Sequence, residues 1–226
     1  MDNSNPFAEE LKATDGFLVM ARELINRIKL HTYRKEYPAA NEAAFLLAEI
    51  TEKMTLRTRL LPSFLGSPHA IDRMEMILSD KLDIHLGFTS QGWFFMKIPA
   101  LLPKKSSGSA EYIRSMLYPS ARQFFKRKQP LRYPNSVIIF KHIYNRKRPE
   151  RQCRDHDNIE VNMVVDIIAL YILEDDTALR CAHLYCSAAG DTDGTEVYVV
   201  PQEEFIEWLV AENAGDLPGL LYDVPP

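Results

Sequence analysis

Cysteine, glycine and long apolar runs are all scarce in this sequence of 226 residues. The three cysteines, Cys153, Cys181 and Cys186, are an odd number and too few for a disulfide framework, so we expect free thiols. No run approaches the roughly 18 consecutive apolar residues that a membrane-spanning helix needs. The first residues, MDNSNPFAEELK, are polar and acidic and lack the apolar stretch of a secretory leader. We therefore expect a cytoplasmic protein without a membrane segment.

The composition is that of a folded chain. Hydrophobic residues make up 46% of the sequence and aromatic residues 10%, and both are spread along its length. This content excludes an intrinsically disordered protein. A chain of this length can bury a substantial core, either as one large domain or as a domain with a helical extension.

Each of two long segments nearly lacks charge of one sign. Residues 104–154 contain 14 Lys and Arg against 2 acids, whereas residues 155–226 contain 16 Asp and Glu against 1 base. So basic a segment predicts an anionic partner, for which we consider DNA. The alternative is that the basic and acidic segments pair with each other inside the fold. The candidate DNA-binding residues are Lys104, Lys105, Arg146, Lys147, Arg148, Arg151 and Arg154.

The first part of the chain predicts a helical hairpin. Apolar residues recur at helical spacing after Gly16, Pro38 interrupts the pattern, and Asn41 can cap a second helix. Such hairpins are packing devices far more often than active sites, so we assign this one no chemistry. The predicted inner faces comprise Leu18, Ala21, Ile25 and Ile28 in the first helix, and Ala44, Leu47, Ile50 and Met54 in the second.

The remainder predicts an α+β domain, because helical and strand patterns alternate along it. We divide the chain into a helical region at 1–90, an α+β domain at 91–212 and a loose tail at 213–226. Pro119 is expected to kink or divide the helix that contains it. The expected helices are 70–82, 109–127, 158–171 and 203–212, and the expected strands are 93–98, 136–144, 179–186 and 195–200.

The most function-like feature is a group of five aspartates that follows the basic segment. Asp155 and Asp157 open the predicted helix, Asp166 lies within it, and Asp175-Asp176 follow it. Because that helix is almost wholly apolar, we expect it to be buried, and a carboxylate within it requires a partner or a metal ion. Carboxylate oxygens suit Mg²⁺ or Mn²⁺. We expect Asp155, Asp157 and Asp176 to bind the metal, with Asp166 and Asp175 as supporting catalytic residues.

Two other interpretations of the same residues stay open. Asp157 and Asn158 can simply cap the helix while Asp175 and Asp176 form a solvated turn. A zinc site is the second alternative, although the ligand spacing is not that of a usual zinc finger. Its ligands would come from Cys153, His156, Cys181, His183 and Cys186.

The segment Arg154-Asp-His-Asp-Asn158, followed by Asp166 and the pair Asp175-Asp176, resembles the signature of RusA-type Holliday-junction resolvases. The resemblance covers residues 92–200 and extends to the Pro103-Lys-Lys loop. It implies a RusA-like mixed sheet and Mg²⁺-dependent cleavage of branched DNA. The two-fold character of such DNA makes a homodimer natural. The sequence departs from that pattern at Val161, where the family carries a lysine, unless Asn162 takes the position through an inserted residue.

Over nearly its whole length the chain is also similar to an uncharacterised family carried on bacterial mobile elements. This similarity rests on Gly92-Trp-Phe, on the run Ile98-Pro-Ala-Leu-Leu-Pro-Lys-Lys and on Arg154-Asp-His-Asp-Asn-Ile-Glu-Val-Asn162. It implies no activity. The alternative function is therefore a non-catalytic accessory protein that binds DNA or a protein partner. The missing lysine favours this alternative, whereas the intact carboxylates favour the endonuclease.

Overall fold

The computed structural model describes residues 5–66, 69–105, 109–126, 128, 131–149, 153, 155–217 and 221–223. The chain forms two compact units, Met1–Glu75 and Met76–Pro226, and each is described by itself. No helix in these ranges is both long and apolar enough to cross a membrane.

The first unit contains a helical hairpin, as the sequence predicts. Helix α1 (Pro6–Tyr33) packs along α2 (Tyr37–Leu60), which continues into the 3-10 helix η1 (Leu61–Leu65). The side chain of Asn5 caps α1 by accepting a hydrogen bond from the Phe7 N–H at 3.1 Å. Helix α3 (Ala70–Lys81) follows and crosses the boundary between the units.

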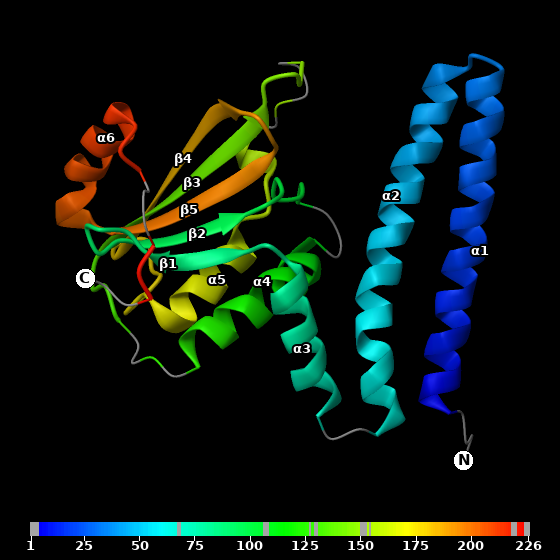
Figure 1. Ribbon diagram of the computed structural model, residues 1–226, viewed down its shortest axis with the longest axis horizontal. Coiled ribbons are helices and arrows are strands. Elements are labelled where there is room, and N and C mark those ends of the chain that lie inside the picture. Colours follow the sequence, from blue (N-terminus) through cyan, green and yellow to red (C-terminus); the bar gives the residue numbers. More distant parts are fainter. Residues whose placement is uncertain are drawn as a thin grey trace. The chain divides into compact units, whose positions relative to one another are not determined.

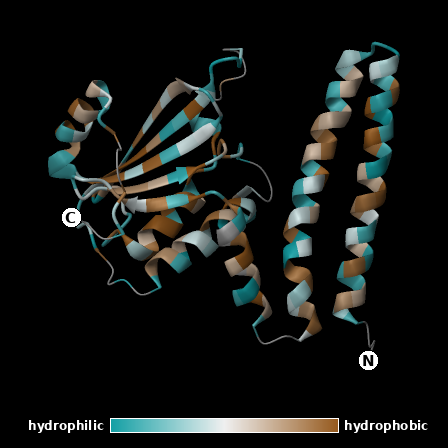
Figure 2. Ribbon diagram, viewed as in Figure 1, coloured by the Kyte–Doolittle hydropathy of each residue, from teal (hydrophilic) through white to brown (hydrophobic). Residues whose placement is uncertain are grey.

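The predicted inner face of α1 is partly wrong. Its buried residues are Thr14, Ala21 and Leu24, whereas Leu18 and Ile25 are 52% and 41% exposed. Hydrophobic residues are interspersed along both helices (Figure 2). Because more than one side of α1 is apolar, helical periodicity alone does not identify the side that contacts α2.

The second unit is built on one five-stranded mixed sheet with helices packed against it, which confirms the predicted α+β class (Figure 1). The strand order is β1-β2-β5-β3-β4, in which only β3 and β4 pair in parallel. The strands are β1 (His85–Phe88), β2 (Phe94–Ile98), β3 (Ser136–Asn145), β4 (Cys181–Gly190) and β5 (Gly194–Pro201).

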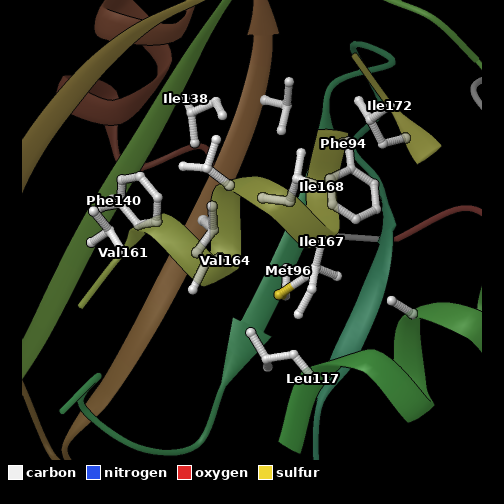
Figure 3. Close-up of a cluster of buried hydrophobic side chains, with 14 of the residues drawn as sticks. Phe94, Met96, Leu117, Ile138, Phe140, Val161, Val164, Ile167, Ile168 and Ile172 are labelled. Carbon is white, nitrogen blue, oxygen red and sulfur yellow. The ribbon is translucent and has the colours of Figure 1, made fainter. Parts of the chain in front are cut away.

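Helices cover both faces of this sheet. Helices α4 (Ser109–Phe125) and α5 (Asn162–Tyr171) lie on one face, and α6 (Phe205–Ala214) follows the short 3-10 helix η4 (Gln202–Glu204) on the other (Figure 1). The larger core lies between the sheet and the pair α4 and α5 (Figure 3). Pro119 does not divide α4, which runs without interruption and buries the proline ring.

The helix predicted from Asn158 begins later. Residues His156–Asn158 form a short 3-10 turn, η3, and Ile159 then pairs in a β-bridge with Lys104. Helix α5 starts at Asn162. The extended stretch between them buries Ile159 and Val161 in the larger core, and this tertiary packing overrides the local helical pattern.

The two edges of the sheet differ. Beside β1, Phe88 and Tyr222 exchange two backbone hydrogen bonds of 2.8 Å, so a short piece of the predicted tail covers that edge. A Cβ atom added at Gly87 would lie only 2.7 Å from the Leu221 Cβ. The glycine therefore allows the tail to pack closely against β1. Among the described residues no strand lies beyond β4.

Arg132 stabilises the C-terminal end of α5. Its guanidinium donates hydrogen bonds to the carbonyl oxygens of Ala169 (2.8 Å) and Leu170 (3.0 Å), which would otherwise lack helical partners. We predict that Arg132→Ala lowers the free energy of unfolding by about 1 kcal/mol in urea denaturation. Arg132→Lys keeps the charge but loses the forked guanidinium donor, so its free energy of unfolding should lie between those of the wild type and Arg132→Ala. Equal stability of all three proteins would contradict this cap.

Candidate functional site

The first acidic turn, residues 155–158, is held against β4 by a histidine. Asp155 and Asp157 are exposed, while His156 between them is half-buried. The His156 Nε2 lies 3.0 Å from the Ser187 hydroxyl oxygen, and its ring stacks on Tyr185 with 5.9 Å between centroids. The turn is therefore anchored at its centre, and both carboxylates point to solvent.

The Pro103-Lys-Lys loop lies directly beside this turn. The Lys105 N–H donates to the Asn158 carbonyl at 3.0 Å, and the Glu160 N–H donates to the Pro103 carbonyl at 2.9 Å. Lys104 and Lys105 are both exposed. These backbone bonds bring the two lysines beside the end of the first acidic turn, about 50 positions further along the chain.

The second acidic turn, residues 174–177, follows α5. The Asp175 carboxylate caps the turn by accepting hydrogen bonds from the Thr177 N–H and hydroxyl, both at 3.1 Å. Asp176 is exposed, and the residue after it, Thr177, accepts a hydrogen bond from the Cys181 N–H at 2.9 Å. Burial lowers the pKa of the His183 imidazole, and the negative charge of Asp176 raises it by less. Asp176 therefore lies near the first part of β4.

The two acidic turns border one strip of β4. His183, Tyr185 and Ser187 alternate along one face of β4, and we call them the β4 strip. Tyr185 packs against the larger core, whereas His183 and Ser187 are exposed. Tyr185 stacks on Phe140 at 5.6 Å, and its hydroxyl lies 3.4 Å from the His183 Nδ1. The first acidic turn contacts the strip at Ser187, through His156. The second acidic turn lies near the other end of the strip, at His183. The sequence predicted a strand at 179–186, but not that these three residues would lie beside the acidic turns.

Asp166 does not occupy the predicted environment. It lies on the solvent-facing side of α5 with Asn162, and both side chains are exposed. The helix is buried through Val164, Val165, Ile167 and Ile168 instead. Helix α5 therefore carries no buried carboxylate at Asp166, contrary to the prediction, and Asn158 does not belong to the helical face because it precedes the helix.

The predicted metal ligands are not gathered within one chain. Among the described residues, no three His, Cys, Asp or Glu side chains are placed to hold a metal ion. This applies to Asp155, Asp157 and Asp176, and equally to the alternative zinc ligands. Burial raises the pKa of the Cys181 thiol, and it raises that of Cys186 to about 11. These two thiols are protonated packing residues at neutral pH.

The basic loop after β3 is partly neutralised inside the fold. Arg148 forms an ion pair with Asp193 that raises the arginine pKa, and Arg146 lies 3.9 Å from Asp191. Lys147 is exposed. The alternative of internal charge pairing is thus realised for two of the predicted DNA-binding residues. Arg151 and Arg154 lie outside the described residues.

The position that replaces the expected lysine is a core position. Val161 is 4% exposed and packs in the larger core near Phe140 (Figure 3). The next residue, Asn162, is exposed at the start of α5. A lysine that acts on a substrate would have to stand at Asn162, because a side chain at position 161 points into the core.

A family model described as a family of unknown function (DUF6100) matches residues 3–222. This match spans almost the whole chain, and the chain therefore belongs to DUF6100. No curated protein matches the sequence.

We predict opposite outcomes for lysine at the two neighbouring positions. Val161→Lys buries an unpaired ammonium group and should lower the free energy of unfolding by roughly 3 kcal/mol or more. Asn162→Lys, at an exposed position, should change stability by less than about 0.5 kcal/mol. Thermal unfolding followed by circular dichroism measures both, and a Val161→Lys protein as stable as Asn162→Lys would contradict the register.

Proposed function

We propose that this DUF6100 protein is a RusA-like, divalent-metal-dependent endonuclease that cleaves branched DNA. The observation that supports this proposal best is the position of the exposed Lys104–Lys105 loop beside the exposed first acidic turn, which itself contacts the β4 strip. Exposed carboxylates next to lysines form a surface that can bind a phosphodiester and a cation together.

The oxygen ligands of the site suit a hard cation, but within one chain the three carboxylates are not gathered around one point. Asp155, Asp157 and Asp176 offer only oxygen ligands, as Mg²⁺ and Mn²⁺ prefer. A bound ion of this class would supply an activated water for phosphodiester hydrolysis. In one chain, however, Asp155 and Asp157 border the opposite end of the β4 strip from Asp176, and no three-ligand group is present among the described residues.

The basic residues would position the DNA. Lys104 and Lys105 are exposed beside the first acidic turn, and Lys147 is exposed beyond the end of β3. Their ammonium groups are suited to phosphate oxygens of the backbone, which carry charge without sequence information. Arg146 and Arg148 already face Asp191 and Asp193, so they would contribute less to binding.

A non-catalytic accessory protein is the second candidate function. Two observations favour it: Val161 is buried where the resembled family carries its lysine, and the three carboxylates are not gathered within the described residues. Such a protein would bind DNA with the same lysines and would not cleave it.

DNA binding should depend on the lysines of the Pro103-Lys-Lys loop more than on Arg148. We predict that Lys104→Ala combined with Lys105→Ala weakens DNA binding and reduces the slope of log affinity against log salt by about 2, because two phosphate contacts are lost. Arg148→Ala, which removes a charge paired with Asp193, should leave that slope nearly unchanged. Fluorescence anisotropy across a salt series measures both variants. A larger effect of Arg148→Ala would place the DNA at the end of β3 instead.

Cleavage separates the two candidate functions. With Mg²⁺ or Mn²⁺ we expect the protein to nick a synthetic four-way junction faster than a linear duplex. Asp157→Asn should abolish nicking without loss of stability, since the carboxylate is exposed. Asn162→Lys should raise the rate, because it places an ammonium group beside the site to offset charge on the phosphate. Selective junction binding without nicking by either the wild type or Asn162→Lys would establish the accessory protein.

A further inference from the structure

Strand β4 is a long sheet edge without the usual protection. It runs for ten residues, Cys181–Gly190, and no other strand lies beyond it among the described residues. Edge strands normally carry charged residues or proline, which prevent pairing with another chain. Between Arg180 and Asp191 this strand contains neither. The opposite edge, at β1, is covered by the segment around Tyr222.

The hydrogen-bonding groups of β4 alternate between β3 and the open edge. The Ser136 N–H donates to the Arg180 carbonyl and the Arg146 N–H donates to the Gly190 carbonyl, both at 2.9 Å. In a parallel ladder the N–H and C=O of one residue point to the same side, and successive residues alternate sides. The backbone groups of the even-numbered residues of β4 therefore face β3. The backbone groups of His183, Tyr185 and Ser187 therefore face outward and form a template for an added strand.

The charges at the two ends of β4 select the partner and its direction. Arg180 precedes the strand and Asp191 follows it, and both side chains are exposed. Within one chain the Arg180 guanidinium donates to the Asn135 side-chain oxygen at 3.3 Å and Asp191 lies 3.9 Å from Arg146, and both contacts are at the surface. An antiparallel second copy of β4 would place Arg180 of each chain near Asp191 of the other. A parallel copy would oppose like charges at both ends, which is unfavourable. The neutral strand between them carries no charge to repel its own copy.

We propose that a second copy of this chain pairs antiparallel along the outer edge of β4, with Tyr185 near the two-fold axis. The pairing joins two five-stranded sheets into one continuous sheet and closes the symmetry, so it forms a dimer and not a filament. His183 of each chain then lies opposite Ser187 of the other, with about 5.5 Å between Cα atoms.

This pairing has a consequence for the acidic turns, and that consequence rests on the proposed function. Within one chain, His183 and Ser187 are separated by about 13 Å along the strand. In the dimer, the His183 end of one chain adjoins the Ser187 end of the other. Asp176 of one chain thus approaches Asp155 and Asp157 of the second copy, and the site that is dispersed in one chain is completed by two.

The oligomeric state of the full chain tests the pairing. We predict a dimer by sedimentation velocity at micromolar concentration, and a monomer for Ser187→Pro, because proline removes an outward N–H and obstructs an incoming strand. Ser187→Ala is the matched control: it loses the same hydroxyl and should remain dimeric. A monomeric wild type overturns the proposal. A folded Ser187→Pro protein that stays dimeric also overturns it, and places the interface elsewhere.

Cross-linking tests the direction without relying on proline. One chain carries His183→Cys and a differently tagged chain carries Ser187→Cys, both with Cys153 and Cys186 replaced by serine. Mild oxidation of the mixture should give a mixed disulfide, whereas each variant alone should not cross-link, because its two introduced cysteines lie about 13 Å apart along the sheet. The remaining thiol, Cys181, is buried. Self-linking of either variant without the mixed product would overturn the antiparallel register.

Mixing inactive chains tests the shared site. Asp157→Asn and Asp176→Asn should each lose Mn²⁺ binding and junction cleavage, but a re-equilibrated equal mixture should recover about a quarter of wild-type sites, since half the dimers contain one intact pair. If the wild type is active and the mixture recovers nothing, the site lies within one chain. If the wild type is a dimer that neither binds Mn²⁺ nor cleaves, the proposed function fails and the β4 pairing stands.

Discussion

The burial of α5 against the sheet is the interaction on which the arrangement of the second unit depends. Val164, Ile167 and Ile168 are at most 2% exposed and lie in one cluster with residues of β2, β3 and β5. Each fully buried aliphatic side chain of this kind stabilises the folded state by about 1.5–3 kcal/mol. Because the two acidic turns lie shortly before and after this helix in the chain, its position limits where their carboxylates reach the surface.

Local sequence patterns predicted which segments of this domain are helices or strands better than they predicted where those segments begin and how deeply they are buried. The β-rich runs at Phe94–Ile98 and Ser136–Asn145 and the helix from Ser109 were recognisable because apolar periodicity and bounding turn residues agreed. The start of α5 was not, because the bridge between Lys104 and Ile159 holds the preceding residues extended. Strand β1 was also not predicted, because His85–Phe88 is too short for a clear pattern and is a strand only through its pairing with β2.

The exposure of Asp166 shows why the site was only partly predictable. A mostly apolar helix suggested burial on every side, yet α5 presents one narrow polar face to solvent. The juxtaposition of the β4 strip with the first acidic turn depends on the His156–Ser187 contact, which joins residues 31 positions apart. Likewise the pairing of Arg148 with Asp193 is visible only once the end of β3 meets the turn before β5. Charge segregation indicated that opposite segments would interact, but not which residues.

Strand β5 occupies the centre of the sheet although it is the last of the five described strands in chain order. It pairs with β2, some 100 residues earlier, and with β3, so neither strand has its inner neighbour until β5 has been synthesised. Contacts between residues so far apart in sequence form slowly, because closing the long loop between them costs entropy before the hydrogen bonds of the strand pair can form. During translation the apolar faces of β2, β3 and α5 therefore emerge from the ribosome before their central partner. The nascent domain would depend on chaperones, or on rapid release, to escape aggregation.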